Sequence, residues 1–202
     1  MIKNIIFDFG DVFINLDKTA TYKELLKLGD FQITAVVKEV NDLYEMGQIS
    51  TLEFIDAYQK VLPKASKQDL IQAWNAILLD FPLYRLNFLE NLAKKQNYKL
   101  ILLSNTNELH ITWIKENISF YETFKSYFDE FYLSHEIYLR KPNTDIFEFV
   151  LEKNNIQSHQ TIFIDDTKEN TDSAAKLGIH TWNNNPKTED ITNLFTIKSD
   201  LF

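Results

Sequence analysis

The chain has 202 residues, 45% of them hydrophobic and 14% aromatic, and its formal net charge is −8. This size and composition predict one substantial core, or a core with a smaller appendage, and the lack of cysteine excludes disulfides and thiolate chemistry. Because lysines are scattered among an excess of acids, and no apolar run approaches the roughly 20 residues of a membrane span, we expect no nucleic-acid or membrane partner. We therefore expect a compact cytoplasmic protein with a small-molecule partner, and the sequence does not indicate its oligomeric state.

Short β-rich runs recur along the chain and predict five strands. The first, second and fourth are almost continuously apolar, which is typical of strands buried on both faces of a parallel sheet. Helix-period runs lie between the strands, and the last stops at Gly178, which suits a helix C-terminus. The alternation predicts a doubly wound, Rossmann-like α/β fold. The predicted strands are 2–9, 98–105, 130–135, 161–166 and 179–184, and the predicted crossover helices are 84–96, 107–120, 143–154 and 168–177.

The interval after the first predicted strand is different. Residues 16–82 carry four helix-period patterns without a convincing strand, and they predict a four-helix insertion. The patterns are YKELLKLG, ITAVVKEVNDLYEM, TLEFIDAYQKVLP and, over residues 69–81, DLIQAWNAILLDF. Its exit is marked by Pro82, whereas its start is less clearly marked. We therefore expect residues 1–15 and 83–202 to form the core and residues 16–82 to form a helical appendage.

Polar residues follow four of the five predicted strands. Ligands of such sheets bind beyond the carboxyl ends of the strands, so these side chains should share one cleft. A single Asp after a strand is more often a turn or cap residue, and the argument rests on the whole set. The set is Asp8 after the first strand, Ser104 and Asn105 after the second, Lys141 after the third, and Asp165 and Asp166 after the fourth.

This set of side chains suits phosphoryl transfer. Converging carboxylates repel one another unless a cation neutralises them, and an all-oxygen set favours Mg²⁺. Lys141 adds a positive charge, and the Ser104 hydroxyl with nearby backbone N–H groups can bind phosphoryl oxygens. Asp8 is left as the nucleophile, which would form an aspartyl-phosphate that water then cleaves.

The motifs resemble those of haloacid dehalogenase-superfamily phosphatases over essentially the full chain. FDFGDV resembles the nucleophile strand, LLSNTN the phosphate-binding segment, LRKPN the lysine segment, FIDDTKEN the metal-binding acids and YEMGQIST a segment of a small helical cap. The runs LLSNTNELH and YLSHEIYLRKPNTDIFEFVL look most like the branch that contains α-D-glucose-1-phosphate phosphatases. The resemblance implies a cap that closes over a sugar phosphate such as glucose 1-phosphate.

The same resemblance implies roles for individual residues. Glu45, in the cap segment, could hydrogen-bond sugar hydroxyls or could simply be a solvated acid at a helix end. The implied catalytic residues are Asp8, Ser104 and Lys141; the implied substrate contacts are Ser104, Asn105, Lys141 and Glu45; the implied Mg²⁺ ligands are Asp8, the backbone carbonyl of Gly10, Asp166 directly and Asp165 through water.

Gly10 departs from the commonest family pattern. Most phosphatases of the superfamily that this chain resembles carry an Asp at this position, and that Asp protonates the leaving group. The branch that contains glucose-1-phosphate phosphatases commonly carries Gly instead. Asp11 is a candidate replacement, but its place in the loop suggests a turn residue. Without a positioned acid, we expect a preference for good leaving groups, and therefore for sugar 1-phosphates over sugar 6-phosphates.

Three alternative classes fit parts of the pattern. A 2-haloacid dehalogenase also uses an Asp nucleophile, but it needs no metal, which leaves Asp165 and Asp166 unexplained. A response-regulator receiver combines the same residue types, but there the acidic pair follows the first strand and the phosphorylated Asp follows the third. Here the order is reversed, which argues against a receiver. A catalytically weak, phosphate-binding interaction protein stays open because Gly10 removes a catalytic group, and turnover of a phosphomonoester with Mg²⁺ distinguishes it from an enzyme.

Overall fold

The computed structural model describes all 202 residues and centres on a five-stranded, wholly parallel sheet with the strand order β3-β2-β1-β4-β5. All five predicted strands are present, and the predicted doubly wound α/β class is confirmed. No helix is long and apolar enough to span a membrane. The strands are β1 (Asn4–Phe7), β2 (Lys99–Ser104), β3 (Glu130–Leu133), β4 (Thr161–Asp165) and β5 (His180–Asn183).

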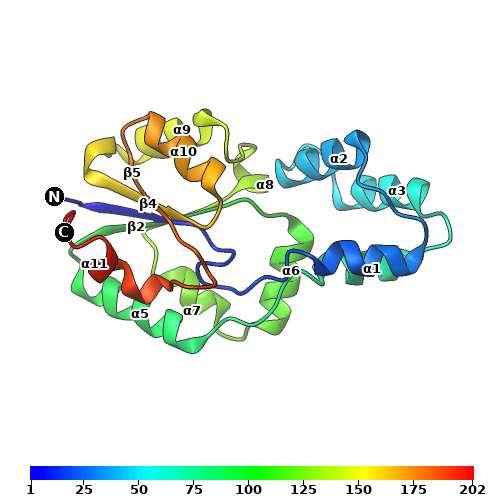
Figure 1. The fold of residues 1–202 in the computed structure, drawn as a ribbon, viewed down its shortest axis with the longest axis horizontal. Coiled ribbons are helices and arrows are strands. Elements are labelled where there is room, and N and C mark those ends of the chain that lie inside the picture. The colour runs from blue at the N-terminus through cyan, green and yellow to red at the C-terminus, as the bar shows by residue number, and fades with distance from the viewer.

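Seven helices accompany the sheet. They are α5 (Leu83–Lys95), α6 (Glu108–Asn117), α7 (Tyr121–Ser126), α8 (Ser134–Ile137), α9 (Thr144–Asn154), α10 (Lys168–Lys176) and α11 (Leu194–Ile197), with 3₁₀ turns at Ser158–Gln160 and Ile191–Asn193. Helices α9 and α10 cover one face of the sheet, and α5, α7 and α11 cover the other (Figure 1). The four predicted crossover helices are confirmed, whereas the short helices α7, α8 and α11 were not predicted. Gly178, at φ +80°, follows the end of α10 as expected.

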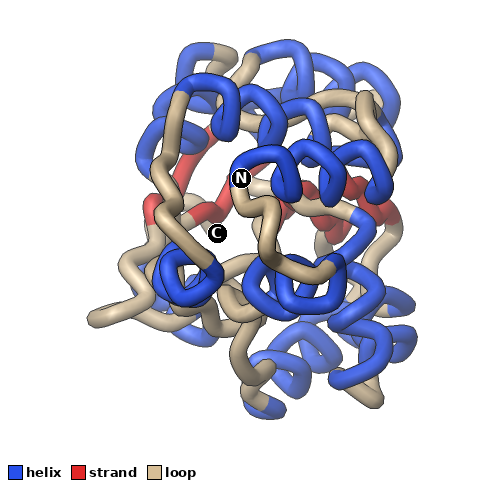
Figure 2. The backbone as a smooth tube through the Cα atoms, turned by 90° about the vertical axis from the view of Figure 1, so that its right-hand side faces the viewer, coloured by secondary structure: helices blue, strands red, loops and turns tan.

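Successive strand residues enter opposite hydrophobic cores. Ile5 and Phe7 pack into the cluster beneath α5, α6 and α7, whereas Ile6 packs into the cluster beneath α9 and α10. Figure 2 shows the strands between helical layers above and below. A strand with both faces buried needs apolar residues at every position, which explains the continuous apolar runs.

Four further helices form a separate lobe beyond the carboxyl ends of the strands (Figure 1). They enclose their own hydrophobic cluster, which includes Phe54, Tyr58 and Trp74. The fourth predicted helical run extended to residue 81, but the helix ends at Asn75 because Leu78 and Phe81 pack into the core of the sheet instead. The helices are α1 (Ala20–Leu28), α2 (Ala35–Glu45), α3 (Thr51–Val61) and α4 (Lys67–Asn75).

The two connections to this lobe are hydrogen-bonded to each other. The backbone N–H of Asn15 donates to the carbonyl of Asp80 (2.9 Å), and the N–H of Leu79 donates to the carbonyl of Asn15 (3.0 Å). The N–H of Asp17 donates to the carbonyl of Ile77 (2.9 Å). We call residues 15–17 and 77–80 the linker ribbon. It ties the entry of the lobe to its exit.

A buried arginine anchors the linker ribbon. The side chain of Arg85 in α5 donates from Nε to Asp190 Oδ2 (2.9 Å), and from Nη1 to the carbonyl of Phe13 (3.2 Å) and to Asn15 Oδ1 (2.9 Å). Arg85 is only 5% exposed. One guanidinium therefore joins α5, the start of the ribbon and the C-terminal segment.

Replacing this guanidinium should destabilise the core. We expect Arg85→Met to lower the free energy of unfolding by about 2–4 kcal/mol, because it leaves the Phe13 carbonyl and Asn15 Oδ1 without their donor and removes the cation that faces the Asp190 carboxylate. Urea denaturation followed by circular dichroism measures the loss. Lys94→Met, on the same helix, removes one partner of an exposed pair with Glu90 and should leave the midpoint nearly unchanged. Equal losses in the two variants would contradict the anchoring role.

Candidate active site

The predicted site residues converge at the carboxyl edge of the sheet, where a cavity of about 400 Å³ opens. Ser104 and Asp165 are buried and contact residues of its wall, and every other predicted site residue lines it. We call this space the catalytic cavity. Its wall consists of Asp8, Gly10, Leu16, Lys18, Glu45, Asn105, Arg140, Lys141, Pro142, Asp166, Thr167, Glu169 and Asn170.

A buried lysine joins two of the predicted carboxylates. Lys141 is 1% exposed, and its Nζ donates to Asp8 Oδ1 (2.8 Å), to Asp165 Oδ2 (2.7 Å) and to the carbonyl of Leu103 (2.8 Å). Burial by itself would lower the pKa of the Lys141 ammonium, but the two carboxylates outweigh burial and raise that pKa. The ammonium therefore stays charged and holds Asp8 in a fixed place.

The loop after β2 supports this lysine. Asn105 Nδ2 donates to the carbonyl of Lys141 (2.8 Å), and the N–H of Lys141 donates to Asn105 Oδ1 (2.9 Å). This pairing gives Asn105 a positioning role, and its contact with a substrate stays a prediction. Ser104 Oγ donates only a long hydrogen bond, at 3.4 Å, to the carbonyl of Asn105, so its hydroxyl is free to turn toward a ligand.

The two neighbouring acids after β4 are held differently. Asp165 accepts from the N–H of Thr167 (2.7 Å) and from Asn170 Nδ2 (3.1 and 3.0 Å), in addition to Lys141. The carboxylate of Asp166 pairs only with Lys18. Asp166 is therefore better able to exchange its partner for a metal ion, and the direct role of Asp166 and the indirect role of Asp165 as metal ligands stay predictions.

The three acids form a cluster that fits a hard cation. Each of Asp8, Asp165 and Asp166 offers a ligand atom, and these atoms lie within 4.8 Å of one another. Burial raises the pKa of Asp8 to about 7, against the opposing effect of Lys141, and burial also raises the pKa of Asp166. Crowded carboxylates of this kind are stabilised by a divalent ion with oxygen ligands. Gly10, whose carbonyl is the remaining predicted ligand, lines the same cavity.

The space beside Gly10 is filled by a leucine. A Cβ at position 10 would lie 2.7 Å from Leu16 Cδ1, so an acid there would have to displace the Leu16 side chain. Asp11 adopts φ +53°, as expected for a turn, and its Oδ1 accepts from the N–H of Leu16 (3.0 Å). Asp11 lines a neighbouring cavity and not the catalytic one. The structure therefore places no carboxyl group where the family's usual acid would stand.

The helical lobe contributes one residue to the catalytic cavity. Glu45, at the end of α2, accepts from Arg140 Nη2 (2.8 Å) and Nε (3.2 Å) through Oε2. Arg140 Nη1 lies 3.1 Å from Asp42 Oδ1, and Ser134 Oγ donates to the backbone carbonyl of Glu45 (2.6 Å). Burial raises the pKa of Glu45, although Arg140 opposes the shift. These contacts hold the lobe against the core beside the cavity.

Sequence reasoning missed three charged residues of this wall, Lys18, Arg140 and Glu169. Arg140 precedes Lys141 in the LRKPN motif, but the motif gives no sign of its partner Glu45. Lys18 lies in a segment without strand or helix periodicity and carries no signal. Asn170, four positions after Asp166, donates from Nδ2 to both carboxylate oxygens of Asp165 and so helps to order the loop after β4.

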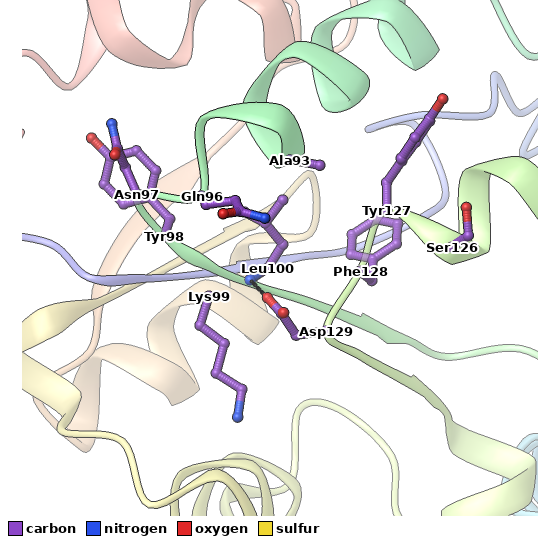
Figure 3. A pocket seen from close by; sticks show the side chains of 10 residues that line it. All are labelled: Ala93, Gln96, Asn97, Tyr98, Lys99, Leu100, Ser126, Tyr127, Phe128 and Asp129. Atoms are coloured by element: carbon purple, nitrogen blue, oxygen red, sulfur yellow. Dashed lines mark hydrogen bonds between the residues drawn. The ribbon is translucent and has the colours of Figure 1, made fainter.

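A second hollow, of about 650 Å³, lies at the opposite end of β2 (Figure 3). Its only charged residues are Lys99 and Asp129, and Asp129 Oδ2 accepts from the N–H of Leu100 (2.7 Å). The hollow therefore gathers no catalytic set.

Fold and site together define a doubly wound α/β protein with an acidic, lysine-bridged centre. Residues 5–183 match the family model described as haloacid dehalogenase-like hydrolase. An enzyme of this family from Bacteroides thetaiotaomicron is 36% identical over 96% of this chain and 98% of its own, with a TM-score of 0.86. The same enzyme in complex with magnesium and inorganic phosphate superposes with a TM-score of 0.81, at 36% identity over 96% of this chain and 100% of its own.

A curated relative is D-ribitol-5-phosphate phosphatase of Bacteroides thetaiotaomicron, which is 29% identical over 90% of this chain and 91% of its own. The chain belongs to the haloacid dehalogenase-like hydrolase family, as its motifs predicted.

The raised pKa of Asp8 makes stability depend on pH in the absence of a cation. The folded protein favours the protonated carboxyl, so the contribution of Asp8 to stability is complete below about pH 4 and is lost as the pH rises through about 7. We expect Asp8→Asn, which removes this titration, to gain stability relative to the wild type between about pH 5 and about pH 8. Urea denaturation of both proteins across this pH range, with a chelator present, measures the difference in stability. A difference that is constant with pH would contradict the burial of Asp8.

Proposed function

We propose that the protein is a Mg²⁺-dependent phosphomonoester hydrolase that acts on a small phosphorylated sugar or sugar alcohol through an aspartyl-phosphate. The observation that carries the proposal is the buried Lys141, which holds Asp8 and Asp165 beside Asp166 at the wall of the catalytic cavity. The relative with bound magnesium and inorganic phosphate and the relative named as a sugar-alcohol phosphatase support it.

In the proposed reaction, Asp8 is the nucleophile. Its Oδ1 is engaged by Lys141, so Oδ2 attacks the phosphorus while the bond to the leaving oxygen breaks and that oxygen keeps the electron pair. Ser104 Oγ and the Lys141 ammonium stabilise the phosphoryl oxygens. Water then attacks the phosphorus, the bond to Oδ2 breaks, and inorganic phosphate and free Asp8 result. Asp8, Asp166 and the Gly10 carbonyl would hold Mg²⁺, with Asp165 acting through water, and the bound ion would supply positive charge that stabilises the phosphoryl oxygens.

We also propose that α1–α4, within residues 16–82, act as a cap over a core of residues 1–15 and 83–202. Their separate hydrophobic cluster supports this division, and so does the single side chain, Glu45, that they bring to the catalytic cavity. Arg140 engages only Oε2 of Glu45, so Oε1 can accept hydrogen bonds from substrate hydroxyls. Glu45 is thus proposed to contact the organic part of the substrate.

The nucleophile can be tested directly. We expect Asp8→Asn to reduce kcat with a phosphomonoester and Mg²⁺ by more than about 10⁴-fold, because an amide cannot form the phosphoenzyme. Asp11→Asn is the matched control, because Asp11 is three positions away and outside the catalytic cavity, and it should keep most of the activity. Full activity of the wild type in excess chelator would exclude the Mg²⁺ mechanism, and no turnover would favour a phosphate-binding protein.

The substrate class can be tested with matched esters. Position 10 carries no acid for the leaving oxygen, and Leu16 fills the space beside it, so we expect kcat for glucose 1-phosphate to exceed that for glucose 6-phosphate by about tenfold or more. Ribitol 5-phosphate, assayed at the same pH and Mg²⁺ concentration, shows whether contacts in the cavity override the leaving group. Equal kcat values for the two glucose phosphates would mean that another group donates the proton.

A further inference from the structure

Lys18 brings a positive charge from the end of the linker ribbon to the predicted metal site. Its Nζ forms an ion pair with Asp166 Oδ2 and lies 3.3 Å from Asp11 Oδ2. The Lys18 side chain is 54% exposed, whereas that of Asp166 is 7% exposed. A half-exposed ammonium thus neutralises a largely buried carboxylate that accepts from no other side chain or backbone N–H.

The same carboxylate is a proposed ligand of Mg²⁺. An ammonium in contact with Asp166 repels a divalent cation approaching that oxygen, and it occupies an electron pair that the cation requires. Lys141 creates no such conflict at Asp166, because its three hydrogen bonds go to Asp8, Asp165 and the carbonyl of Leu103. Lys18 and the cation therefore compete for one acid.

We propose that Lys18 competes with the divalent cation for Asp166. The Lys18 ammonium pairs with Asp166 when the cation is absent, and it releases Asp166 when the cation binds. The inference rests on the metal site of the proposed function. It assigns to Lys18 a positioning role and not a chemical step.

The position of Lys18 in the chain couples this exchange to the lobe. Asp17 makes the last hydrogen bond of the linker ribbon, to the carbonyl of Ile77, and α1 begins at Ala20. The ion pair of Lys18 with Asp166 is thus a tie between the core and the entry to α1. Since coupling between two equilibria is reciprocal, cation binding loosens this tie, and a lobe that keeps Lys18 on Asp166 weakens cation binding.

Isothermal titration of Mg²⁺ into the full chain tests the competition without any substrate. We expect Lys18→Gln to bind Mg²⁺ about 5- to 150-fold more tightly than the wild type. Lys187→Gln is the control, because Lys187 lines the neighbouring cavity with Lys18 and Asp166 but forms no ion pair, and it should change affinity by less than about threefold. Equal or weaker binding by Lys18→Gln would overturn the inference and would mean that Lys18 orients Asp166 for the metal.

Hydrogen exchange provides the second measurement. Mg²⁺ should accelerate amide exchange at residues 18–20 in the wild type, and this acceleration should be lost in Lys18→Gln; unchanged or slower exchange in the wild type would overturn the coupling to the lobe. Absence of Mg²⁺ binding by the wild type, Lys18→Gln and Lys187→Gln alike would reject the metal site, and with it both proposals. Tight Mg²⁺ binding with no turnover of any ester would reject the hydrolase and leave the competition intact.

Discussion

The contact of the Lys141 ammonium with Asp8 and Asp165 is the constraint around which the rest of the structure is arranged. Burying charges is costly unless each is paired and hydrogen-bonded, and here the carboxyl ends of β1, β2 and β4 and the loop that carries Lys141 all supply partners. Only a parallel sheet with neighbouring β2, β1 and β4 brings these segments to one edge. The site therefore depends on the order of the strands in the sheet.

The core residues of the catalytic cavity carry more negative than positive charge. Three carboxylates, Asp8, Asp165 and Asp166, face one buried ammonium, and the resulting negative excess would repel a phosphate ester. A divalent cation removes the excess and lets Asp8 ionise despite its burial. Lys18 reduces the excess when the cation is absent, so the linker contributes to the electrostatics of a site that the core otherwise builds.

Most of the fold could be predicted from sequence because its signals are local. Ile5, Ile6 and Phe7 are all apolar since both faces of β1 are buried, and Asp8 is polar because it leaves the sheet at that point. The end of α4 could not be predicted, because Leu78 and Phe81 fit a helical period and yet belong to the core of the sheet.

Within the site, contacts between residues far apart in the chain could not be predicted from the sequence. Lys18 pairs with Asp166 across 148 positions and Arg140 pairs with Glu45 across 95, and no periodicity or motif specifies such partners. The contact of Leu16 with the space beside Gly10 could not be predicted either, because it depends on the path of the linker. The strand-end residues were identifiable because their common edge follows from the fold class alone.

The linker ribbon gives the chain the topology of a β-hairpin whose turn has been replaced by a folded lobe. The core meets two hydrogen-bonded connections, and Arg85 holds the first of them through Phe13 and Asn15. Lobes of other sizes can therefore be exchanged at this base, by evolution or by design, without altering the register of the sheet or the catalytic loops. The hairpin base thus allows the core, which carries Asp8, Lys141 and Asp165, and the lobe, whose helices bring only Glu45 to the catalytic cavity, to vary separately.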